Sequence, residues 1–262
     1  MTTLPTLEHI RLSLADGILT ITFDRPDKLN AINPALHRSM ARAFDFAADC
    51  TDARLVVVTG AGRAFSAGGD MDDIASTVPE FAAEAEFGRK IVQRMLDCDK
   101  PILCRLNGDA IGLGATIVAL SDIVVASREA RIGDPHVRMG LVAGDGGALV
   151  WPAHVGMMMA KYYLLTGDLM TADEAKDLGL VTFAVDADDL DERCAKIAAK
   201  LTAGAPLAIK WTKRALNLSL QQQMASVLDM ALAVEGLTVL SKDHAEARTA
   251  FREKRRPVFR GE

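Results

Sequence analysis

Alternating apolar and polar residues mark the first elements of the chain. Residues 9–14 and 18–23 each alternate in this way, which is typical of strands with one buried face. The stretch between them contains Asp16-Gly17, a pair that is favoured in tight hairpin turns. The pattern therefore predicts an amino-terminal β-hairpin.

Helical and strand-like patterns then follow one another along the chain. Asn33-Pro34 suits the start of a helix, because asparagine caps helices and proline is tolerated in the first turn, and the apolar positions in 36–47 recur at helical spacing. The segment 54–60, a short run of β-branched residues that ends in glycine, predicts a strand that is buried on both faces. The alternation continues with an expected helix at about 79–98, strands at 101–106 and 122–126, and an apolar helix near 116–120.

Strands that alternate with helices predict an α/β fold, with a mainly parallel sheet covered by helices. The units could stack as a spiral or lie in an open sheet, and periodicity alone does not decide between these arrangements. Helices dominate from about residue 145. One of them is expected to begin at the capping-box match at 171–174 and to end at Gly179.

A domain boundary is expected where Ala-Gly-Ala-Pro occupies 203–206. Residues 1–203 would form the core with the active site, and residues 204–262 would form a helical region running to about Lys254. Apolar side chains in that region need a surface to cover them, which could be the protein's own core or a neighbouring subunit. They include Leu228, Met230, Leu232, Leu237 and Leu240.

Composition narrows the classes of function. Half of the 262 residues are apolar and a quarter are charged, which is ordinary for a globular protein. The net charge of −5 argues against a nucleic-acid or membrane-surface partner, since both require a positive excess. The most apolar segment, 110–126, is too short and too polar to span a bilayer. Neither kind of partner is therefore expected.

The cysteines, the histidines and the amino-terminal residues indicate whether a metal site is expected and in which cellular compartment the protein is expected. The four cysteines form no Cys-x-x-Cys pair and the five histidines show no ligand spacing, so no metal site is expected. The amino terminus lacks a basic region followed by an apolar stretch, so no signal peptide is expected. Reduced thiols are usual inside cells, and the cytoplasm is the expected location.

Two glycine-bearing loops, FSAGGDM at 65–71 and NGDAIGLGA at 107–115, each follow a predicted strand. Ligand sites gather at the carboxyl ends of strands, and small residues let backbone N–H groups approach a ligand closely. One N–H from each loop could converge on one oxygen as an oxyanion hole, and a helix starting near Leu113 would add its positive end. The alternative is that the glycines only make turns. Neither loop matches a dinucleotide-binding or phosphate-loop pattern.

Together with other motifs, these loops resemble the crotonase superfamily, which is the enoyl-CoA hydratase/isomerase family. The resemblance extends from about residue 8 to KRRPVF at 254–259. The matching motifs occur in the family's order, and they are DRPDKLNA at 24–31, FSAGGD at 65–70, NGxAxGxG at 107–114, LTGD at 165–168 with AxEA at 172–175, and GLV at 179–181.

The resemblance implies a fold, a ligand and an assembly. The fold would be a spiral of ββα units with a helical carboxyl-terminal region that forms trimers, often paired into hexamers. The ligand would be an acyl-CoA thioester, with coenzyme A as part of the substrate and no separate cofactor. The N–H groups of Gly69 and Leu113 would hold the thioester oxygen, although leucine is less usual than glycine at the second position.

The resemblance also assigns residues to the coenzyme A part of the substrate. Two segments would lie along the nucleotide and around its adenine, and a third would reach the nucleotide from the carboxyl-terminal helix. Basic residues between 248 and 256 could neutralise phosphates there, or they could simply be a solvated helix end. The assigned residues are Lys28, Leu29 and Ala31, then Ala67, Asp70 and Met71, and then Phe251 and Lys254.

The chain departs from the family's hydratase pattern at both proton-transfer positions. Hydration of an unsaturated thioester needs a base and an acid, for which the family's hydratases use two glutamates. Thr116, counted here among the substrate-binding residues, and His136 occupy these positions. A threonine hydroxyl has no useful basicity, whereas His136 could act as a base or be a hydrogen-bonded structural histidine.

Asp145 is the other acidic candidate near the site. It lies one residue later than the aspartate that some family members use, which is about 100° of rotation on a helix. It could therefore be catalytic or could cap the helix that follows. Asp109, in a sequence that also suits a turn, is a weaker candidate.

The leading hypothesis is an enzyme that stabilises a thioester enolate with the Gly69 and Leu113 amides and moves protons with His136 and Asp145. Hydration or isomerisation of an enoyl-CoA is the expected reaction. Hydrolysis of a thioester or of a carbon–carbon bond, and dehalogenation with Asp145 as nucleophile, are the alternatives within the fold. A protein that binds CoA esters without catalysis is the alternative of a different class.

Overall fold

The amino-terminal hairpin begins the main sheet, as predicted. In the computed structural model, which describes residues 2–262, β1 (Ile10–Ala15) pairs antiparallel with β2 (Ile18–Phe23). Asp16 and Gly17 turn the chain between them with φ values of 52° and 76°. This left-handed turn is the geometry that Asp-Gly pairs favour in two-residue hairpins.

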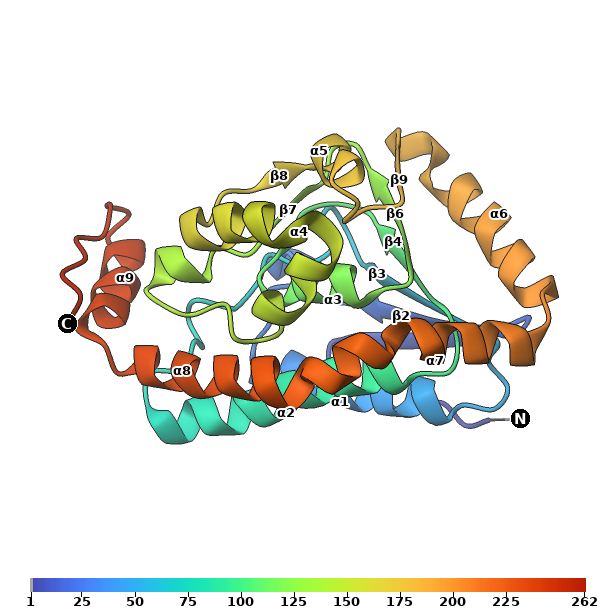
Figure 1. Cartoon of the computed structure of the whole chain (residues 1–262), viewed down its shortest axis with the longest axis horizontal. Helices are drawn as coiled ribbons and strands as arrows, with labels where there is room; N and C mark the ends of the chain where they lie inside the picture. The colour runs from blue at the N-terminus through green and yellow to red at the C-terminus, as the bar shows by residue number, and fades with distance from the viewer. Residues whose placement is uncertain (1) are drawn as a thin grey trace.

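All pairings of the main sheet after the hairpin are parallel, in the order β1-β2-β3-β4-β6-β9 (Figure 1). A smaller sheet has the order β5-β7-β8 and ends in an antiparallel pair. The mainly parallel sheet confirms the sequence prediction. The remaining strands are β3 (Leu55–Gly60), β4 (Ile102–Leu106), β5 (Ala110–Ile111), β6 (Ile123–Ser127), β7 (Arg131–Gly133), β8 (Met170–Thr171) and β9 (Phe183–Val185).

The connecting helices begin where the local sequence supplies caps. The Asn33 side chain accepts a hydrogen bond from the Leu36 N–H at the start of α1, and Thr171 and Glu174 form the predicted capping box of α5. The helix predicted near 116–120 is longer and starts directly after Gly112. The connecting helices are α1 (Pro34–Asp49), α2 (Val78–Asp97), α3 (Leu113–Leu120), α4 (Gly147–Thr166), α5 (Ala172–Asp177) and α6 (Leu190–Ala203).

The strand at β3 is buried on both faces, as its apolar run predicts. Val56 and Val58 belong to the main hydrophobic core. Leu55 points to the other face, where α6 covers it with Leu190 and Cys194. The sheet is therefore enclosed by helices on both sides, which leaves the loops at the strand ends as the place where a ligand can approach.

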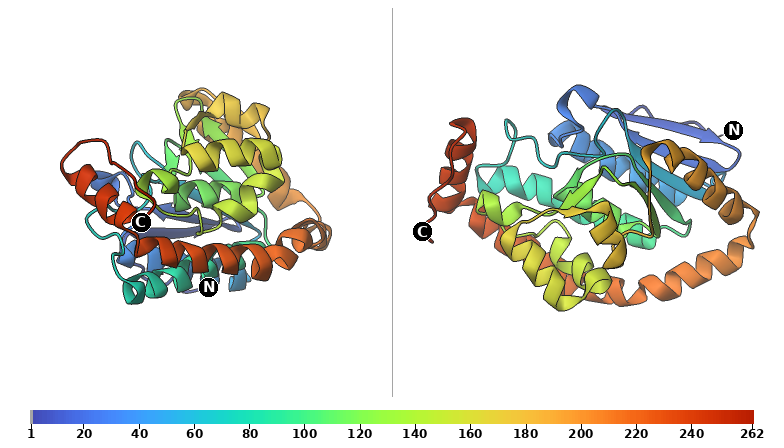
Figure 2. Two further views of the ribbon diagram at one scale, coloured as in Figure 1. Left: turned by 60° about the vertical axis from the view of Figure 1, so that its left-hand side comes forward. Right: turned by 90° about the horizontal axis from the view of Figure 1, so that it is seen from above.

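The carboxyl-terminal region is helical but not continuous. α7 (Pro206–Gln223) passes through one π-helical turn (Met224–Leu228) into α8 (Asp229–Val239), and both pack against α2. The chain then bends into α9 (Lys242–Arg252), whose start is capped by the Ser241 side chain. α9 stands apart at one end of the molecule, next to the carboxyl terminus (Figures 1 and 2).

No single helix within residues 2–262 combines the length and apolarity that crossing a membrane requires. The segments Pro206–Val239 and Lys242–Arg252, bent by 70° relative to each other, meet these criteria only when they are taken as a pair.

Candidate active site

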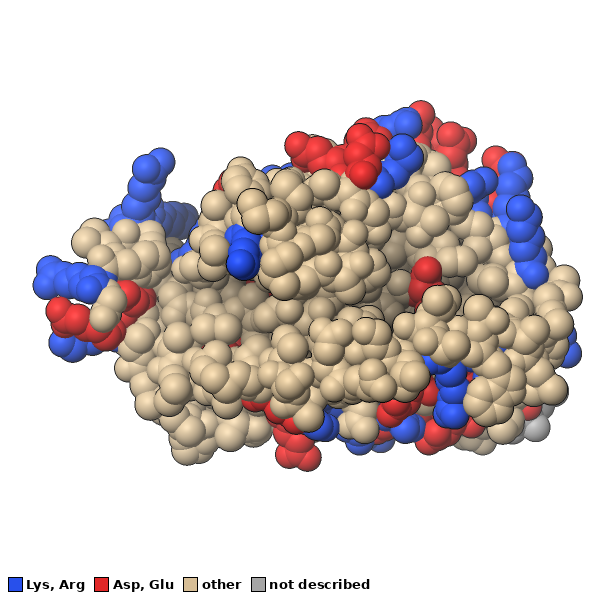
Figure 3. Space-filling model, in the orientation of Figure 1, with Lys and Arg blue, Asp and Glu red and all other residues tan. Residues whose placement is uncertain are grey.

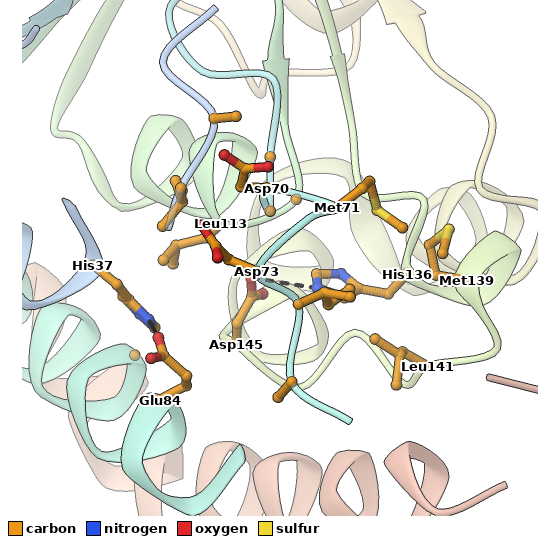
Figure 4. A pocket seen from close by; sticks show the side chains of 18 of the residues that line it. His37, Asp70, Met71, Asp73, Glu84, Leu113, His136, Met139, Leu141 and Asp145 are labelled. Carbon is orange, nitrogen blue, oxygen red and sulfur yellow. Dashed lines mark hydrogen bonds and ion pairs between the residues drawn. The ribbon is translucent and has the colours of Figure 1, made fainter. Parts of the chain in front are cut away.

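A cavity of about 550 Å³ lies where the two glycine loops meet α1, α2, the short 3-10 helix η2 (His136–Met139) and α8 (Figure 4). The loop after β3 contributes residues 67–75 to its wall, and the loop before α3 contributes residues 111–113. α8 contributes Glu235 among other residues. The cavity therefore draws on both sides of the boundary expected near residue 203.

Hydrogen bonds and close packing hold the two glycine loops together. The Ile111 N–H donates to the Ser66 carbonyl at 3.0 Å, and Ser66 and Ala110 form a parallel bridge. A Cβ atom on Gly114 would lie 2.9 Å from the Ser66 Cβ, so this glycine is what lets α3 approach the first loop so closely. The arrangement fixes the backbone of both loops relative to each other.

Two amides on the cavity wall, those of Gly69 and Leu113, are free donors among the described residues. The flanking amides are engaged, since Asp70 N–H donates to the Ile32 carbonyl and Gly112 N–H to the Gly133 carbonyl. Neither Gly69 N–H nor Leu113 N–H has a hydrogen-bond partner within residues 2–262, and both residues line the cavity. Unpaired backbone donors are uncommon in the interior of proteins, and here they belong to residues on the wall of a cavity in which a ligand oxygen could accept from them.

His136 lies against the second loop and is oriented by Asp134. Its Nδ1 is hydrogen-bonded to the fully buried Asp134 carboxylate, which must accept, so the hydrogen is on Nδ1. Its Nε2 is 3.6 Å from Asp145 Oδ2 and 3.9 Å from Glu235 Oε1. A Cβ on Gly112 would lie 3.5 Å from His136 Cε1, so the ring is directly beside the loop that carries the Leu113 N–H.

Burial and mutual charge shift the pKa values of this cluster. Burial alone would lower the pKa of His136, but Asp134, Asp145 and Glu235 together raise it well above its usual value. Burial raises the pKa of Asp145, with His136 opposing and Asp134 adding to the effect. Burial also raises the pKa of Glu235, to about 8. The cluster therefore retains exchangeable protons at neutral pH, as acid–base sites require.

Asp145 does not cap the helix that follows it. The amino-terminal cap of α4 is Gly146, and no side chain donates or accepts there. The Asp145 carboxylate instead accepts a hydrogen bond from the Thr116 hydroxyl at 3.2 Å and lines the cavity. The capping alternative was therefore wrong. Thr116 is fully buried and contacts Asp145 rather than the cavity, so it positions this carboxylate instead of contacting a ligand.

Asp109 lies outside the cavity. Its carboxylate accepts from the Arg131 guanidinium at 2.5 Å and from the Arg131 backbone N–H at 2.8 Å. The Asp109 carboxylate is therefore engaged in an ion pair away from the cavity, and the structure does not support Asp109 as a catalytic candidate.

The residues assigned to coenzyme A divide into two groups. Ala31, Ala67, Asp70, Met71 and Phe251 line the cavity, and Asp70 is held by a 2.6 Å ion pair with Arg25. The other three do not line it. Lys28 is exposed beside Asp72, the Leu29 carbonyl accepts from the Ala67 N–H, and Lys254 is exposed.

The sequence interpretation missed four residues of the cavity region: Asp134, Glu235, His37 and Glu84. Asp134 orients His136, and Glu235 is buried within α8. His37 of α1 and Glu84 of α2 form a second histidine–carboxylate pair on the wall, with Nδ1 and Oε2 2.5 Å apart. An acid inside the otherwise apolar stretch 230–237 was the one local indication of Glu235.

The cluster also bears on the expectation that no metal site is present. Asp134, His136 and Asp145 each offer a possible ligand atom within 4.8 Å of the others. His136 Nδ1 and Asp134 Oδ1 are already hydrogen-bonded to each other, so a cation would have to use other atoms of these side chains. The residues present therefore act first as a hydrogen-bonded acid–base cluster.

The shifted pKa of Glu235 predicts how stability depends on pH. The carboxyl titrates near 4.5 in an unfolded chain and at about 8 in the folded protein. Between these values the folded state binds the additional proton, so the free energy of unfolding falls as the pH rises. Glu235→Gln is neutral throughout. We expect the Tm of the unsubstituted protein, relative to this variant, to fall by at least about 2 °C between about pH 5.5 and pH 8.5.

Thermal unfolding followed by circular dichroism, with both proteins in the same buffers, measures this difference. A Tm difference that is constant over this pH range, or that grows in favour of the unsubstituted protein, would contradict the raised pKa of Glu235.

Comparison with known proteins agrees with the architecture. A family model described as enoyl-CoA hydratase/isomerase matches residues 13–262. The short-chain-enoyl-CoA hydratase of Clostridium acetobutylicum is 32% identical, over 95% of this chain and 97% of that protein. The crystal structure of an enoyl-CoA hydratase/isomerase from Mycobacterium paratuberculosis has a TM-score of 0.88 and 39% identity, covering 92% of this chain and 97% of that chain.

A solved structure of an enzyme with a different activity is also similar. It is a β-diketone hydrolase from the cyanobacterium Anabaena, bound to (S)-3-oxocyclohexyl acetic acid, with a TM-score of 0.83 and 28% identity over 89% of this chain and 95% of that chain. The family model and the relatives cover nearly the whole chain. The chain therefore belongs to the enoyl-CoA hydratase/isomerase family and has the crotonase fold.

Proposed function

We propose that this enzyme binds an acyl-CoA thioester and hydrates or isomerises its carbon–carbon double bond through an enolate. One observation carries the proposal: two free backbone donors and a cluster of proton-transfer groups line the same cavity. The names of the relatives support the substrate class. The reaction requires no cofactor besides the coenzyme A of the substrate.

The Gly69 and Leu113 amides would bind the thioester oxygen. An enolate places negative charge on that oxygen, and fixed N–H donors in a cavity stabilise such charge without reorganisation. Leu113 is the first residue of α3, so the positive end of the helix dipole adds to the effect. The leucine side chain does not matter for this role, because the donor is the main chain.

The His136 cluster would move the protons. Hydration needs a group that accepts a proton from water and a group that donates one to the α-carbon, and isomerisation needs a group that does both in turn. Glu235 keeps its proton at neutral pH because its pKa is about 8. His136 and Asp145 face each other at 3.6 Å and can exchange another proton. We assign proton transfer at the substrate to His136, with Asp145 and Glu235 setting its charge.

Cleavage of a carbon–carbon bond in a β-diketone is the second candidate. The similar structure of a β-diketone hydrolase supports this candidate. The candidate base also supports it, because His136, hydrogen-bonded to Asp134, stands where the family's hydratases have a glutamate. After passing the proton of its Nε2 to Asp145, His136 would be a neutral base that takes a proton from water as the oxygen attacks a ketone carbonyl. The same amides would hold the resulting oxyanion, and the bond to the neighbouring carbon would break to release an enolate.

Three assays on the purified protein separate the candidates. Loss of enoyl absorbance from but-2-enoyl-CoA supports hydration, and a shift of the double bond in but-3-enoyl-CoA supports isomerisation. Acid formation from a cyclic 1,3-diketone supports the second candidate. Tight CoA-ester binding with no change in any assay would contradict both and favour the protein that binds without catalysis.

We also propose that the chain assembles as a trimer or a dimer of trimers in the cytoplasm. Large apolar side chains are exposed over α4, α7 and α8, where the surface is mostly uncharged (Figure 3). Exposed apolar areas of this kind mark protein interfaces. The four cysteines are unpaired and buried, which suits a reducing compartment. The exposed residues include Met158, Leu165, Leu216, Met230 and Leu237.

Light scattering tests the assembly. We expect a mass of three or six chains at micromolar concentration. Replacing Leu216 and Leu237 with glutamate should shift the protein toward monomer, and a monomer before any substitution would contradict the proposal.

A further inference from the structure

The His37–Glu84 pair has no part in the proton transfer described above, yet both residues line the same cavity (Figure 4). His37 lies on α1 and Glu84 on α2, and in Figure 4 they lie across the cavity from His136, with Asp145 between. The His37 imidazole is about nine-tenths buried and packs edge-on against Phe87. The ring is therefore fixed by its surroundings.

The pairing leaves one carboxylate oxygen free. A carboxylate can only accept, so His37 Nδ1–H donates to Glu84 Oε2 over 2.5 Å. Glu84 Oε1 makes no hydrogen bond with any residue in 2–262. The Glu84 side chain is 26% exposed, so this oxygen is not sealed within the protein. The histidine thus holds a carboxylate with an open acceptor position.

Apart from His37, the cavity wall beside Glu84 is apolar and contains no lysine or arginine among the described residues. Phe81, Ala85 and Gly88 come from the same face of α2 and line the cavity beside it. No lysine or arginine is among the described residues that line the cavity, whereas Asp145 and Glu235 lie on it. A ligand group that donates a hydrogen bond to this carboxylate would be bound favourably, whereas a second anion would be repelled.

We propose that Glu84, positioned by His37, is a specificity-determining residue that accepts a hydrogen bond from a hydroxyl group on the acyl chain. The preferred substrates are then enoyl thioesters that carry a hydroxyl beyond the reacting carbons, and chains that end in a carboxylate are rejected. The inference rests on the proposed function, since it requires that the acyl end of a thioester enters this cavity. A site that hydrogen-bonds a substrate hydroxyl discriminates strongly against the analogue that lacks it.

The test compares kcat/KM for hex-2-enoyl-CoA, its 5-hydroxy and 6-hydroxy derivatives, and the thioester of hex-2-enedioic acid. We expect at least one hydroxylated substrate to exceed the parent by about tenfold or more, and the dicarboxylic one to fall below it by a similar factor. Glu84→Leu should abolish the hydroxyl preference and reduce the penalty on the carboxylate, each measured as the ratio to the parent substrate in the same variant.

Two further variants separate this role from a structural one. Glu84→Gln keeps an acceptor oxygen and the side-chain size, so it should retain part of the hydroxyl preference and lose most of the carboxylate penalty. Glu86→Leu removes the same charge from the exposed side of α2, outside the cavity, and should change none of the ratios. Equal ratios in the unsubstituted protein, or an equal loss on every substrate in Glu84→Leu, would overturn the proposal.

A binding measurement tests the role of Glu84 even if the proposed catalytic function is wrong. If the unsubstituted protein turns over none of these thioesters, binding of saturated hexanoyl-CoA and 6-hydroxyhexanoyl-CoA is measured by calorimetry. Tighter binding of the hydroxylated ester that is lost in Glu84→Leu supports the assignment of Glu84 even then. Equal binding of both esters, or no binding, overturns it.

Discussion

Replacing His136 with glutamine should lower kcat by about 100- to 10,000-fold, the usual contribution of a positioned acid–base group, while KM changes by no more than a few-fold. Glutamine has a similar size and can still donate to Asp134, so the cluster keeps its shape. It cannot take up or release a proton near neutral pH. Steady-state kinetics with the enoyl-CoA or diketone that the protein accepts measures the effect.

A histidine outside the cavity supplies the matched control. His154 Nε2 is hydrogen-bonded to the Ala119 carbonyl at 2.7 Å and does not line the cavity. A glutamine amide can replace that donor, so His154→Gln should leave kcat within about twofold. Turnover at the unsubstituted rate in His136→Gln would remove this residue from the mechanism.

The parts of the fold that were predicted correctly depend on interactions between residues that are close in the sequence. The Asp16-Gly17 turn, the Asn33 cap and the Thr171 capping box each satisfy backbone groups within a few residues, so their pattern is visible locally. The apolar run at β3 is equally informative, because burial on both faces leaves no polar alternation. Such features need no knowledge of distant segments.

The carboxyl-terminal helices were predicted less completely for a physical reason. The sequence indicated continuous helix to about Lys254, whereas α8 ends before Ser241 and α9 begins there. Serine is tolerated inside helices and favoured at their caps. Which role Ser241 takes depends on where α9 packs. The position of α9 is fixed by His244, which is hydrogen-bonded to the Met139 and Ala75 carbonyls of remote segments.

The role of Asp145 could not be decided from the sequence either. Aspartate before a helix usually caps it, and a one-residue offset separated Asp145 from the family's catalytic position. The deciding contact is with Thr116, which lies 29 residues earlier in the chain. No local pattern encodes such a contact, because it forms only when α3 and the turn before α4 pack together.

His37, Glu84 and Glu235 escaped prediction for the same reason. A polar residue on an amphipathic helix usually faces water, and α1 and α2 carry many that do. Only the packing of α1 on α2, and of α2 on α8, brings these three side chains to one cavity. The glycine loops were easier, since closely spaced glycines after a strand predict backbone exposure to a ligand wherever the helices lie.

Leu113 allows a direct test of the backbone donor. Leu113→Pro removes only the N–H from the main chain, and proline is favoured at the first position of a helix, which Leu113 occupies. Gly112 has φ 56° and ψ −125°, the mirror image of the conformation preferred before proline, and glycine adopts either hand. We expect kcat to fall by about 100- to 1,000-fold, because losing one oxyanion donor costs about 2.7–4 kcal/mol at the transition state.

Leu113→Ala separates the donor from the side chain. It removes most of the buried leucine side chain but keeps the N–H, so it should cost stability, about 2–5 kcal/mol for a fully packed leucine, and leave kcat within about fivefold. The proline variant removes the same side chain and should lose stability to a similar extent, but it should add a large loss of turnover that the alanine variant lacks. If both variants lost turnover equally, the side chain would be shaping the cavity, and the oxyanion would have to be bound elsewhere. The two substitutions at one position thus decide whether the main chain at the start of α3 stabilises the enolate.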